Sequence, residues 1–269
     1  MSRIETSLFS LGYMDILARR DSPVHRLESR AKLITTMFFI ITVVSFGKYE
    51  LSMLAPFFIY PVYLVSAGDL PVRWLMKKVL YVAPFALMIA LFNPVLDRSI
   101  MVHLGGVGFS GGWISFFSIM MRFCLTVSAA LAMIACTGFR SVCLAMDRLG
   151  MPRMFAVQLL FLYRYLFVLA EEALRMSRAR TLRSFGERSS MKSYAGLVGS
   201  ILLRTINRAQ RIHLAMTCRG FDGRIHIMRQ ERFGMKDLVF IVFWCSLFMV
   251  LRSFDIPQAL GVLVTGALT

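Results

Sequence analysis

Long apolar segments alternate with short polar joints along much of the chain. Five such segments stand out, at residues 31–46, 51–67, 79–95, 113–139 and 234–252. Each is a candidate membrane helix, because about 20 apolar residues cross a bilayer and interfacial side chains extend shorter segments. Residues 256–268 form a sixth candidate, either a short span or a re-entrant segment. The pattern predicts an all-α polytopic membrane protein with about five membrane helices, or six.

Residues that favour the membrane interface or turns lie at the ends of these segments. Tyr60 is expected near an interface, and the long side chains of Arg30 and Lys32 are expected to extend the first helix outward. Pro84 predicts a kink in the third segment. The glycine-rich residues 105–112 predict a loop before the fourth segment.

The chain changes character after residue 139. Residues 140–236 contain 18 Lys and Arg against 6 Asp and Glu, yet apolar residues still recur at helical spacing among them. A short amphipathic helix is expected at 141–149, and two long helices are expected at 154–183 and 193–219. This region is therefore predicted to be folded, helical and largely outside the lipid.

Composition and charge support that division and set the topology. The 269 residues are 57% hydrophobic and 17% charged, with a net charge of +16, which is a membrane composition and excludes a free nucleic-acid-binding protein. Basic segments remain cytoplasmic, so a multi-pass membrane protein with a cytoplasmic N-terminus is expected. Four parts follow: a cytoplasmic segment at 1–30, membrane helices at 31–139, a cytoplasmic or interfacial region of long helices at 140–235, and a C-terminal membrane segment at 236–269.

Converging groups of the kind that an enzyme needs are scarce. Glu171 and Glu172 are adjacent and point about 100° apart on a helix, so they do not form a paired-carboxylate site. The sequence has no GxxxxGK[ST] phosphate loop and no HExxH metal motif. We therefore predict no catalytic, cofactor-binding or metal-ligating residues, and any ATP would be bound by a partner.

Arg122 is the one charged residue of the fourth apolar segment. A charge inside a membrane helix is costly and usually faces the interior of the bundle. Three interpretations remain open: Arg122 lines a pathway, forms a structural pair with a carbonyl at a helix end, or reaches the interface with its long side chain.

A near-repeat stands in the basic region. Leu182-Arg183-Ser184-Phe185-Gly186 ends one predicted long helix, and Cys218-Arg219-Gly220-Phe221-Asp222-Gly223 ends the next. A glycine stop with a nearby arginine is typical of helix C-termini, which accounts for part of the pattern. Two matching guanidinium groups at successive helix ends also suit a protein that grips two equivalent acidic grooves.

At these residues the chain resembles the transmembrane T component of energy-coupling factor (ECF) transporters, in its cobalt-type CbiQ branch. The motif that this family typically carries is Ala-Arg-Gly, from which Leu182, Ser184 and Cys218 depart while the arginines remain. Further matches are the segment 21–27 before the first span, the Gly150-Met151-Pro152 break, the 178–180 run and the segment 215–221. The resemblance covers roughly residues 15 to 255.

The resemblance implies a non-catalytic scaffold of an ATP-driven importer in the bacterial inner membrane, with residues 140–235 as its coupling-helix region. The implied ATPase-coupling residues are Leu182, Arg183, Ser184, Cys218, Arg219 and Gly220. It implies two cytoplasmic ABC-type ATPase subunits and a CbiM-like substrate-binding S component, with a small accessory membrane subunit as a further candidate. Cobalt for cobalamin biosynthesis is the expected substrate, with nickel or a vitamin as alternatives. A membrane-embedded transferase and an autonomous carrier are the competing classes.

Overall fold

The structure is a computed structural model that divides into two compact units. It describes residues 14–18, 20–47, 50–96, 100–104, 107–185, 191–223 and 233–253. One unit comprises Leu17–Gly138 and Glu231–Thr269, and we call it the membrane bundle. The other comprises Met1–Ile16 and Phe139–Gln230, and we call it the basic unit.

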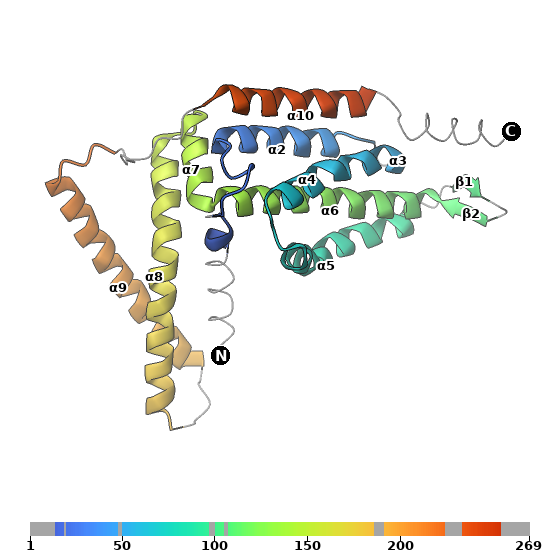
Figure 1. The fold of residues 1–269 in the computed structure, drawn as a ribbon. Helices are drawn as coiled ribbons and strands as arrows, with labels where there is room; N and C mark the ends of the chain where they lie inside the picture. Colours follow the sequence, from blue (N-terminus) through green and yellow to red (C-terminus); the bar gives the residue numbers. More distant parts are fainter. Residues whose placement is uncertain are drawn as a thin grey trace. The chain divides into compact units, whose positions relative to one another are not determined.

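The membrane bundle is built around one long central helix. Its elements are α2 (Ser29–Val44), α3 (Leu51–Leu54), the 3-10 helix η1 (Ala55–Phe58), α4 (Ile59–Ala67), α5 (Val72–Leu96), β1 (Ile100–Leu104), β2 (Val107–Ser110), α6 (Gly111–Thr137) and α10 (Met235–Ser253). Helices α2, α4 and α5 all pack against α6, and α10 packs beside α2 (Figure 1). The described residues are overwhelmingly helical, so the predicted all-α membrane class is confirmed.

Three boundaries in the bundle differ from the expectations. The segment 51–67 divides into α3, η1 and α4, because Pro56 lies in the first turn of η1 and lacks the N–H of a regular helix. Helix α5 begins at Val72 and continues through Pro84. A break at Pro84 would leave backbone N–H and C=O groups without hydrogen-bond partners in lipid, where no water is present. Of the glycine-rich stretch that was expected to be a loop, residues 107–110 form strand β2, which pairs antiparallel with β1, and residues 111–112 begin α6, while residues 105–106 lie outside the described residues.

Aromatic rings fill the space between α2, η1, α4 and α10. The ring centre of Phe39 lies 4.8 Å from that of Tyr60 and 5.3 Å from that of Phe248, while Trp244 lies 4.9 Å from Tyr60. The Tyr60 hydroxyl is 2.7 Å from the Thr36 hydroxyl, which satisfies both groups away from water. Tyr60 is fully buried, and this hydrogen bond lets the ring serve as core, while its expected position near the membrane interface stays a prediction.

From Phe139 onward the described part of the basic unit contains the helices α7 (Phe139–Arg148), α8 (Arg153–Arg183) and α9 (Met191–Cys218). The three helices predicted there are therefore confirmed. Phe139 of α7 stacks on Tyr163 of α8, with ring centres 4.7 Å apart. Helix α8 buries only Ala156, and α9 buries no residue. These two long helices consequently lack a hydrophobic core of their own.

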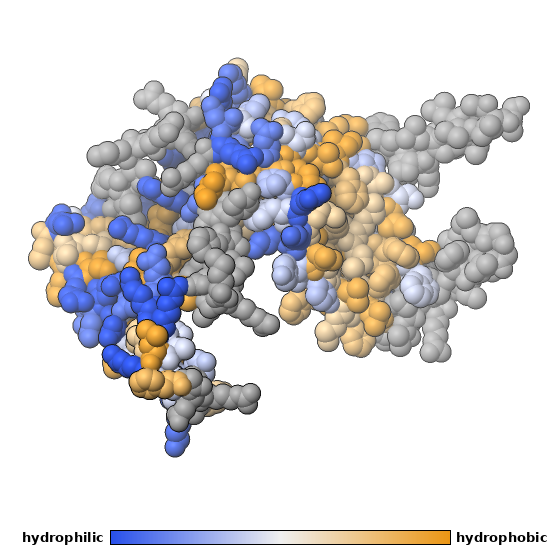
Figure 2. Space-filling model, turned by 60° about the horizontal axis from the view of Figure 1, so that its bottom comes forward, coloured by the Kyte–Doolittle hydropathy of each residue, from blue (hydrophilic) through white to orange (hydrophobic). Residues whose placement is uncertain are grey.

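Length and composition allow three helices of the described chain to cross a membrane. They are Val72–Asn93, Gly112–Thr137 and Arg153–Arg183, and Leu51–Ala67 is a shorter apolar helix. Helix α8 enters this set through its apolar first half, so its predicted location outside the lipid stays a prediction. On the face in Figure 2 the membrane bundle is largely hydrophobic, as expected for a surface that contacts acyl chains.

Candidate functional site: arginines at the ends of α8 and α9

The two arginines of the near-repeat lie at the ends of the two long helices. Arg183 is the last residue of α8, and Arg219 directly follows α9, which ends at Cys218. Both arginine side chains are exposed, and neither makes a hydrogen bond or ion pair within the described residues. Two strong hydrogen-bond donors thus stand at the helix ends, available to a partner.

The end of α9 is closed by a glycine in the left-handed conformation. Gly220 has φ +75°, and its N–H donates to the Thr217 carbonyl at 3.0 Å, while the Phe221 N–H donates to the Met216 carbonyl at 3.1 Å. This pair of bonds is the Schellman motif, in which glycine avoids the steric strain of a side chain. Gly220 therefore ends the helix, and Arg219 is presented in the turn.

The end of α8 is built differently. The Ser184 N–H donates to the Arg180 carbonyl at 3.0 Å, and Phe185 takes the left-handed position with φ +46°. Leu182 and Phe185 expose 78% and 96% of their surface, so apolar groups flank the Arg183 guanidinium. Relative to the helix ends the near-repeat is offset by one residue, since Arg183 is inside α8 and Arg219 is outside α9.

Helix α7 also ends in a Schellman motif. The N–H groups of Gly150 and Met151 donate to the carbonyls of Asp147 and Met146, at 3.2 and 3.1 Å. A glycine stop is therefore a general device of this unit, which explains the glycine of the second motif. Helix α7 likewise ends in an exposed arginine, but Arg148 makes an interaction of its own, whereas the side chains of Arg183 and Arg219 make no hydrogen bond or ion pair within the described residues.

Helices α8 and α9 are joined by charge. The Glu172 carboxylate of α8 lies 3.4 Å from a guanidinium nitrogen of Arg204 and 3.6 Å from one of Arg208, both on α9. The Arg180 guanidinium lies over the ring of Tyr194, 5.1 Å from its centre. Glu171 is exposed, so the two adjacent glutamates have separate environments, as their spacing on a helix requires.

Arg122 meets a carbonyl at the end of a neighbouring helix. Its guanidinium donates to the Gly47 carbonyl, just after α2, and at the opposite end of α2 the Lys32 ammonium donates to the Cys136 carbonyl at 3.3 Å. The two contacts are about 22 Å apart along the antiparallel helices. The structure thus places Arg122 in the second of the three predicted arrangements, a pair with a helix-end carbonyl.

Lys32 was expected to extend outward, and this was wrong. The residue is only 2% exposed, because it turns inward to the last carbonyls of α6, which have no partner within their own helix. Among the cysteines, Cys136 and Cys143 are buried, whereas Cys218 is exposed at the tip of α9.

Asp237 is a structural residue that sequence reasoning missed. Its carboxylate accepts the Gly234 N–H at 2.9 Å and the Glu28 N–H at 2.7 Å. It therefore caps α10 and α2 together, with its negative charge at two helix N-termini. An acidic residue three positions after the glycine that precedes α10 was the available signal.

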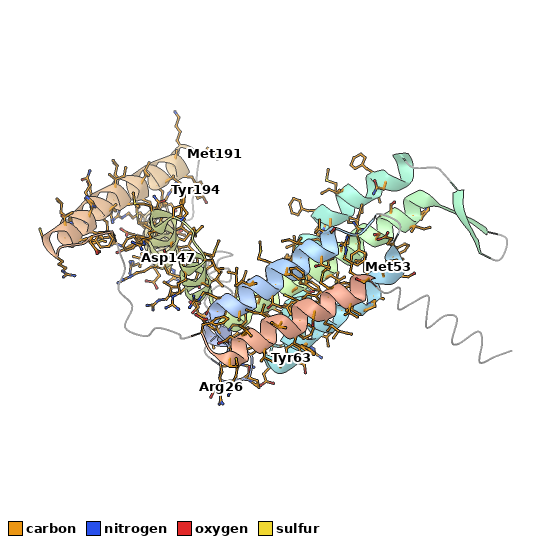
Figure 3. All side chains as sticks on the ribbon, turned by 90° about the horizontal axis from the view of Figure 1, so that it is seen from above. Arg26, Met53, Tyr63, Asp147, Met191 and Tyr194 are labelled. Atoms are coloured by element: carbon orange, nitrogen blue, oxygen red, sulfur yellow. The ribbon has the colours of Figure 1, made fainter. Side chains whose placement is uncertain are left out.

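The segment before α2 is held by a short network of polar contacts. Asp21 and Arg26 form a two-point ion pair at 2.8 and 2.9 Å, and Figure 3 places Arg26 at the outer surface. The hydrogen bond from Arg26 lowers the pKa of the Asp21 carboxyl. His25 contacts the Ser22 hydroxyl at 2.7 Å and the Leu17 carbonyl at 3.0 Å, and burial lowers its pKa.

Metal ligands do not gather in the described residues, where no three His, Cys, Asp or Glu side chains come together. The arrangement offers docking and structural contacts through arginines, lysine and carboxylates. Its chemistry is therefore recognition by charge-assisted hydrogen bonds.

Comparison with known proteins gives the family. The CbiQ model, described as cobalt transport protein, matches residues 20–229. An uncharacterised protein of Methanocaldococcus jannaschii is 26% identical over 243 residues, which cover 86% of this chain and 82% of that protein. The cobalt transport protein CbiQ of Salmonella typhimurium is 31% identical over 104 residues, 38% of this chain and 46% of that protein. A helical membrane protein whose matched region includes the ends of both α8 and α9 thus belongs to the CbiQ family of cobalt transport proteins.

Proposed function

We propose that this protein is the membrane scaffold of an ATP-driven, ECF-type cobalt importer. It joins a substrate-binding membrane subunit to two cytoplasmic ATPase subunits and transmits their conformational change. The observation that carries the proposal is the pair of exposed arginines, Arg183 and Arg219, at the ends of two helices that contact each other through Glu172. The chain itself contributes neither catalysis nor a cofactor, and the ATPase subunits bind and hydrolyse ATP.

The chemistry of the helix ends supports docking into partner grooves. A guanidinium group forms two parallel hydrogen bonds with a carboxylate, or donates to carbonyls at a helix end. The exposed Leu182 and Phe185 beside Arg183 would exclude water from such a contact. An arginine surrounded by apolar contacts is a common arrangement of strongly contributing interface residues.

Cobalt is the proposed substrate because the matching family is one of cobalt transport proteins. Nickel or a vitamin is a weaker candidate, with no observation on this chain in its favour. The substrate itself would be captured by the CbiM-like membrane subunit. No contact or cluster described above favours the competing class, a membrane-embedded transferase.

The proposed orientation in the cell membrane places the N-terminus and the basic unit in the cytoplasm. Cys218 is a native reporter for this, because it is exposed at the end of α9. With the other four cysteines replaced, a membrane-impermeant maleimide should label Cys218 only after cells are permeabilised. Labelling of intact cells to the same extent would reverse the orientation.

Reversal of the two arginine charges tests the coupling role. Loss of a buried charge-assisted contact costs about 2–5 kcal/mol, against at most about 1 kcal/mol for an exposed pair. Arg183→Glu and Arg219→Glu should each reduce recovery of the ATPase subunits in co-purification and abolish ATP-driven cobalt uptake, with normal insertion of the chain. The double variant should bind ATPase subunits least.

Arg175→Glu and Arg211→Glu are matched controls for that experiment. Each is an exposed arginine eight residues before the tip arginine on the same helix. They should retain most ATPase association and uptake. If all four variants show the same ATPase association and uptake, the near-repeat marks two helix ends and has no coupling function.

A further inference from the structure

One carboxylate holds α8 and α9 together at their crossing. Glu172 is 14% exposed and faces two guanidinium groups, those of Arg204 and Arg208, which are one helical turn apart on α9. We call these three residues the pivot. Figure 1 shows α8 and α9 crossing after the connection between them, as expected for an antiparallel pair that then diverges.

Both arginine tips lie several helical turns beyond the pivot. Arg183 follows Glu172 by eleven residues along α8, whereas Arg219 follows Arg208 by eleven residues and Arg204 by fifteen. At about 1.5 Å per residue, the α8 tip is about 16 Å from the pivot and the α9 tip about 16–22 Å. Because the helices are antiparallel, the two arms extend from the pivot toward opposite ends of the pair.

No fully buried apolar side chain lies at the crossing of these helices. Helix α9 buries no residue, and α8 buries only Ala156, near its start and far from the pivot. A further polar contact, Arg180 over Tyr194, lies near the connection between the helices. Within the described residues, the ion pairs between the two helices are therefore those of the pivot.

We propose that Glu172 is the positioning residue of the coupling helices, which fixes their crossing so that Arg183 and Arg219 are held on arms that extend in opposite directions. This inference rests on the proposed function and deepens it. Two such arms suit a partner that offers two equivalent grooves related by two-fold symmetry, such as a pair of ATPase subunits. A motion of one groove is then transmitted through the pivot to the other groove. In this role Glu172 contacts neither ATP nor cobalt.

The first test measures the arms in the full-length chain, in lipid nanodiscs and without ATPase subunits. Spin labels are placed at native Cys218 and at Leu182→Cys, with the other four cysteines replaced, and pulsed electron paramagnetic resonance gives the distance distribution. The parent should give a narrow distribution, and Glu172→Gln should broaden it at least twofold. Glu171→Gln, an exposed neighbour of equal charge, should leave it unchanged. An unchanged distribution in Glu172→Gln overturns the pivot.

Charge reversal separates positioning from general stability. Glu172→Arg should broaden the distribution further, and its combination with Arg204→Glu and Arg208→Glu should restore the narrow distribution. A variant that merely loosens the fold would not be rescued by two more substitutions. Failure of this rescue overturns the assignment of the pivot to charge.

The second test uses the complex with its ATPase subunits in proteoliposomes. Glu172→Gln should retain the ATPase subunits yet increase the ATP hydrolysed per cobalt ion transported by about tenfold, with recovery in the charge-reversed combination. A broadened distance distribution with an unchanged ratio would overturn the positioning role. If Arg183→Glu and Arg219→Glu leave transport intact, the proposed function fails, whereas the distance result still decides whether the pivot exists.

Discussion

The membrane bundle and the basic unit use charged residues in opposite ways. In the bundle, charges turn inward to backbone groups: Lys32 to the Cys136 carbonyl, Arg122 to the Gly47 carbonyl and Asp237 to the N–H groups of Gly234 and Glu28. In the basic unit, α8 and α9 bury almost nothing, and the tip arginines point to solvent.

The difference is what we expect if the bundle is surrounded by lipid and the basic unit largely by water. Backbone groups at helix ends need partners where water is scarce, so a charge that binds them stabilises the bundle. The long helices of the basic unit have their backbone bonds within each helix, which leaves their side chains available for other contacts. A pair of helices without its own apolar core gains most of its order from partners.

Asp237→Ala should have the largest effect on the bundle. The substitution leaves two N–H groups at helix N-termini without their charged acceptor, which costs roughly 3–5 kcal/mol. Thermal unfolding in detergent should show a loss of stability of that size, and Asp237→Asn should lose less because its amide oxygen still accepts one bond. A loss below about 1 kcal/mol in Asp237→Ala would contradict a buried double cap.

Arg122→Leu should have a moderate effect, about 1–2 kcal/mol, because it removes one charge-assisted bond to the Gly47 carbonyl. Met121→Leu, its neighbour on α6, is the control and should be nearly neutral. Cobalt uptake should fall only in proportion to the folded protein. A much larger loss of uptake, with stability retained, would assign Arg122 to a transport pathway. Arg122 would then no longer be an example of a structural charge in the bundle.

Arg219→Ala should hardly change the stability of the isolated chain, by less than about 0.5 kcal/mol, because its side chain is exposed. When ATPase subunits are added, the stability of this variant should rise less than the stability of the parent does. This contrast between isolated and assembled protein would confirm that the basic unit depends on partners. A stability loss in the isolated chain as large as that of Arg122→Leu would instead make Arg219 a structural residue.

His25 should give the smallest effect, seen as a pH dependence. Burial first, and then the charge of Lys32, lowers the pKa of His25 below its ordinary value of 6.5. The unfolded chain therefore takes up a proton before the folded chain does, so this contribution to stability is complete above about pH 6.5 and declines as the pH falls. Between pH 7.5 and 5.5 the melting temperature of the parent should fall slightly more than that of His25→Gln. Parallel curves would contradict the lowered pKa.

Much of the helical architecture could be read from the sequence, because helix formation and membrane insertion depend on local pattern. The apolar segments predicted α2, α6 and α10, and the spacing of apolar residues among charges predicted α8 and α9. The near-repeat placed Arg183 and Arg219 at helix ends. These features depend on neighbours within a few turns, which the sequence displays directly.

Only the tertiary structure decided which distant groups meet. Glu172 precedes Arg204 by 32 residues and Asp237 follows Glu28 by 209, so no local pattern relates these partners. Likewise, an amphipathic tyrosine or lysine near the end of an apolar segment suits an interface or a core equally well. The burial of Tyr60 and Lys32 depends on the Thr36 hydroxyl and the Cys136 carbonyl, which tertiary packing brings within hydrogen-bonding distance. A polar group enters the interior only where packing supplies its partner.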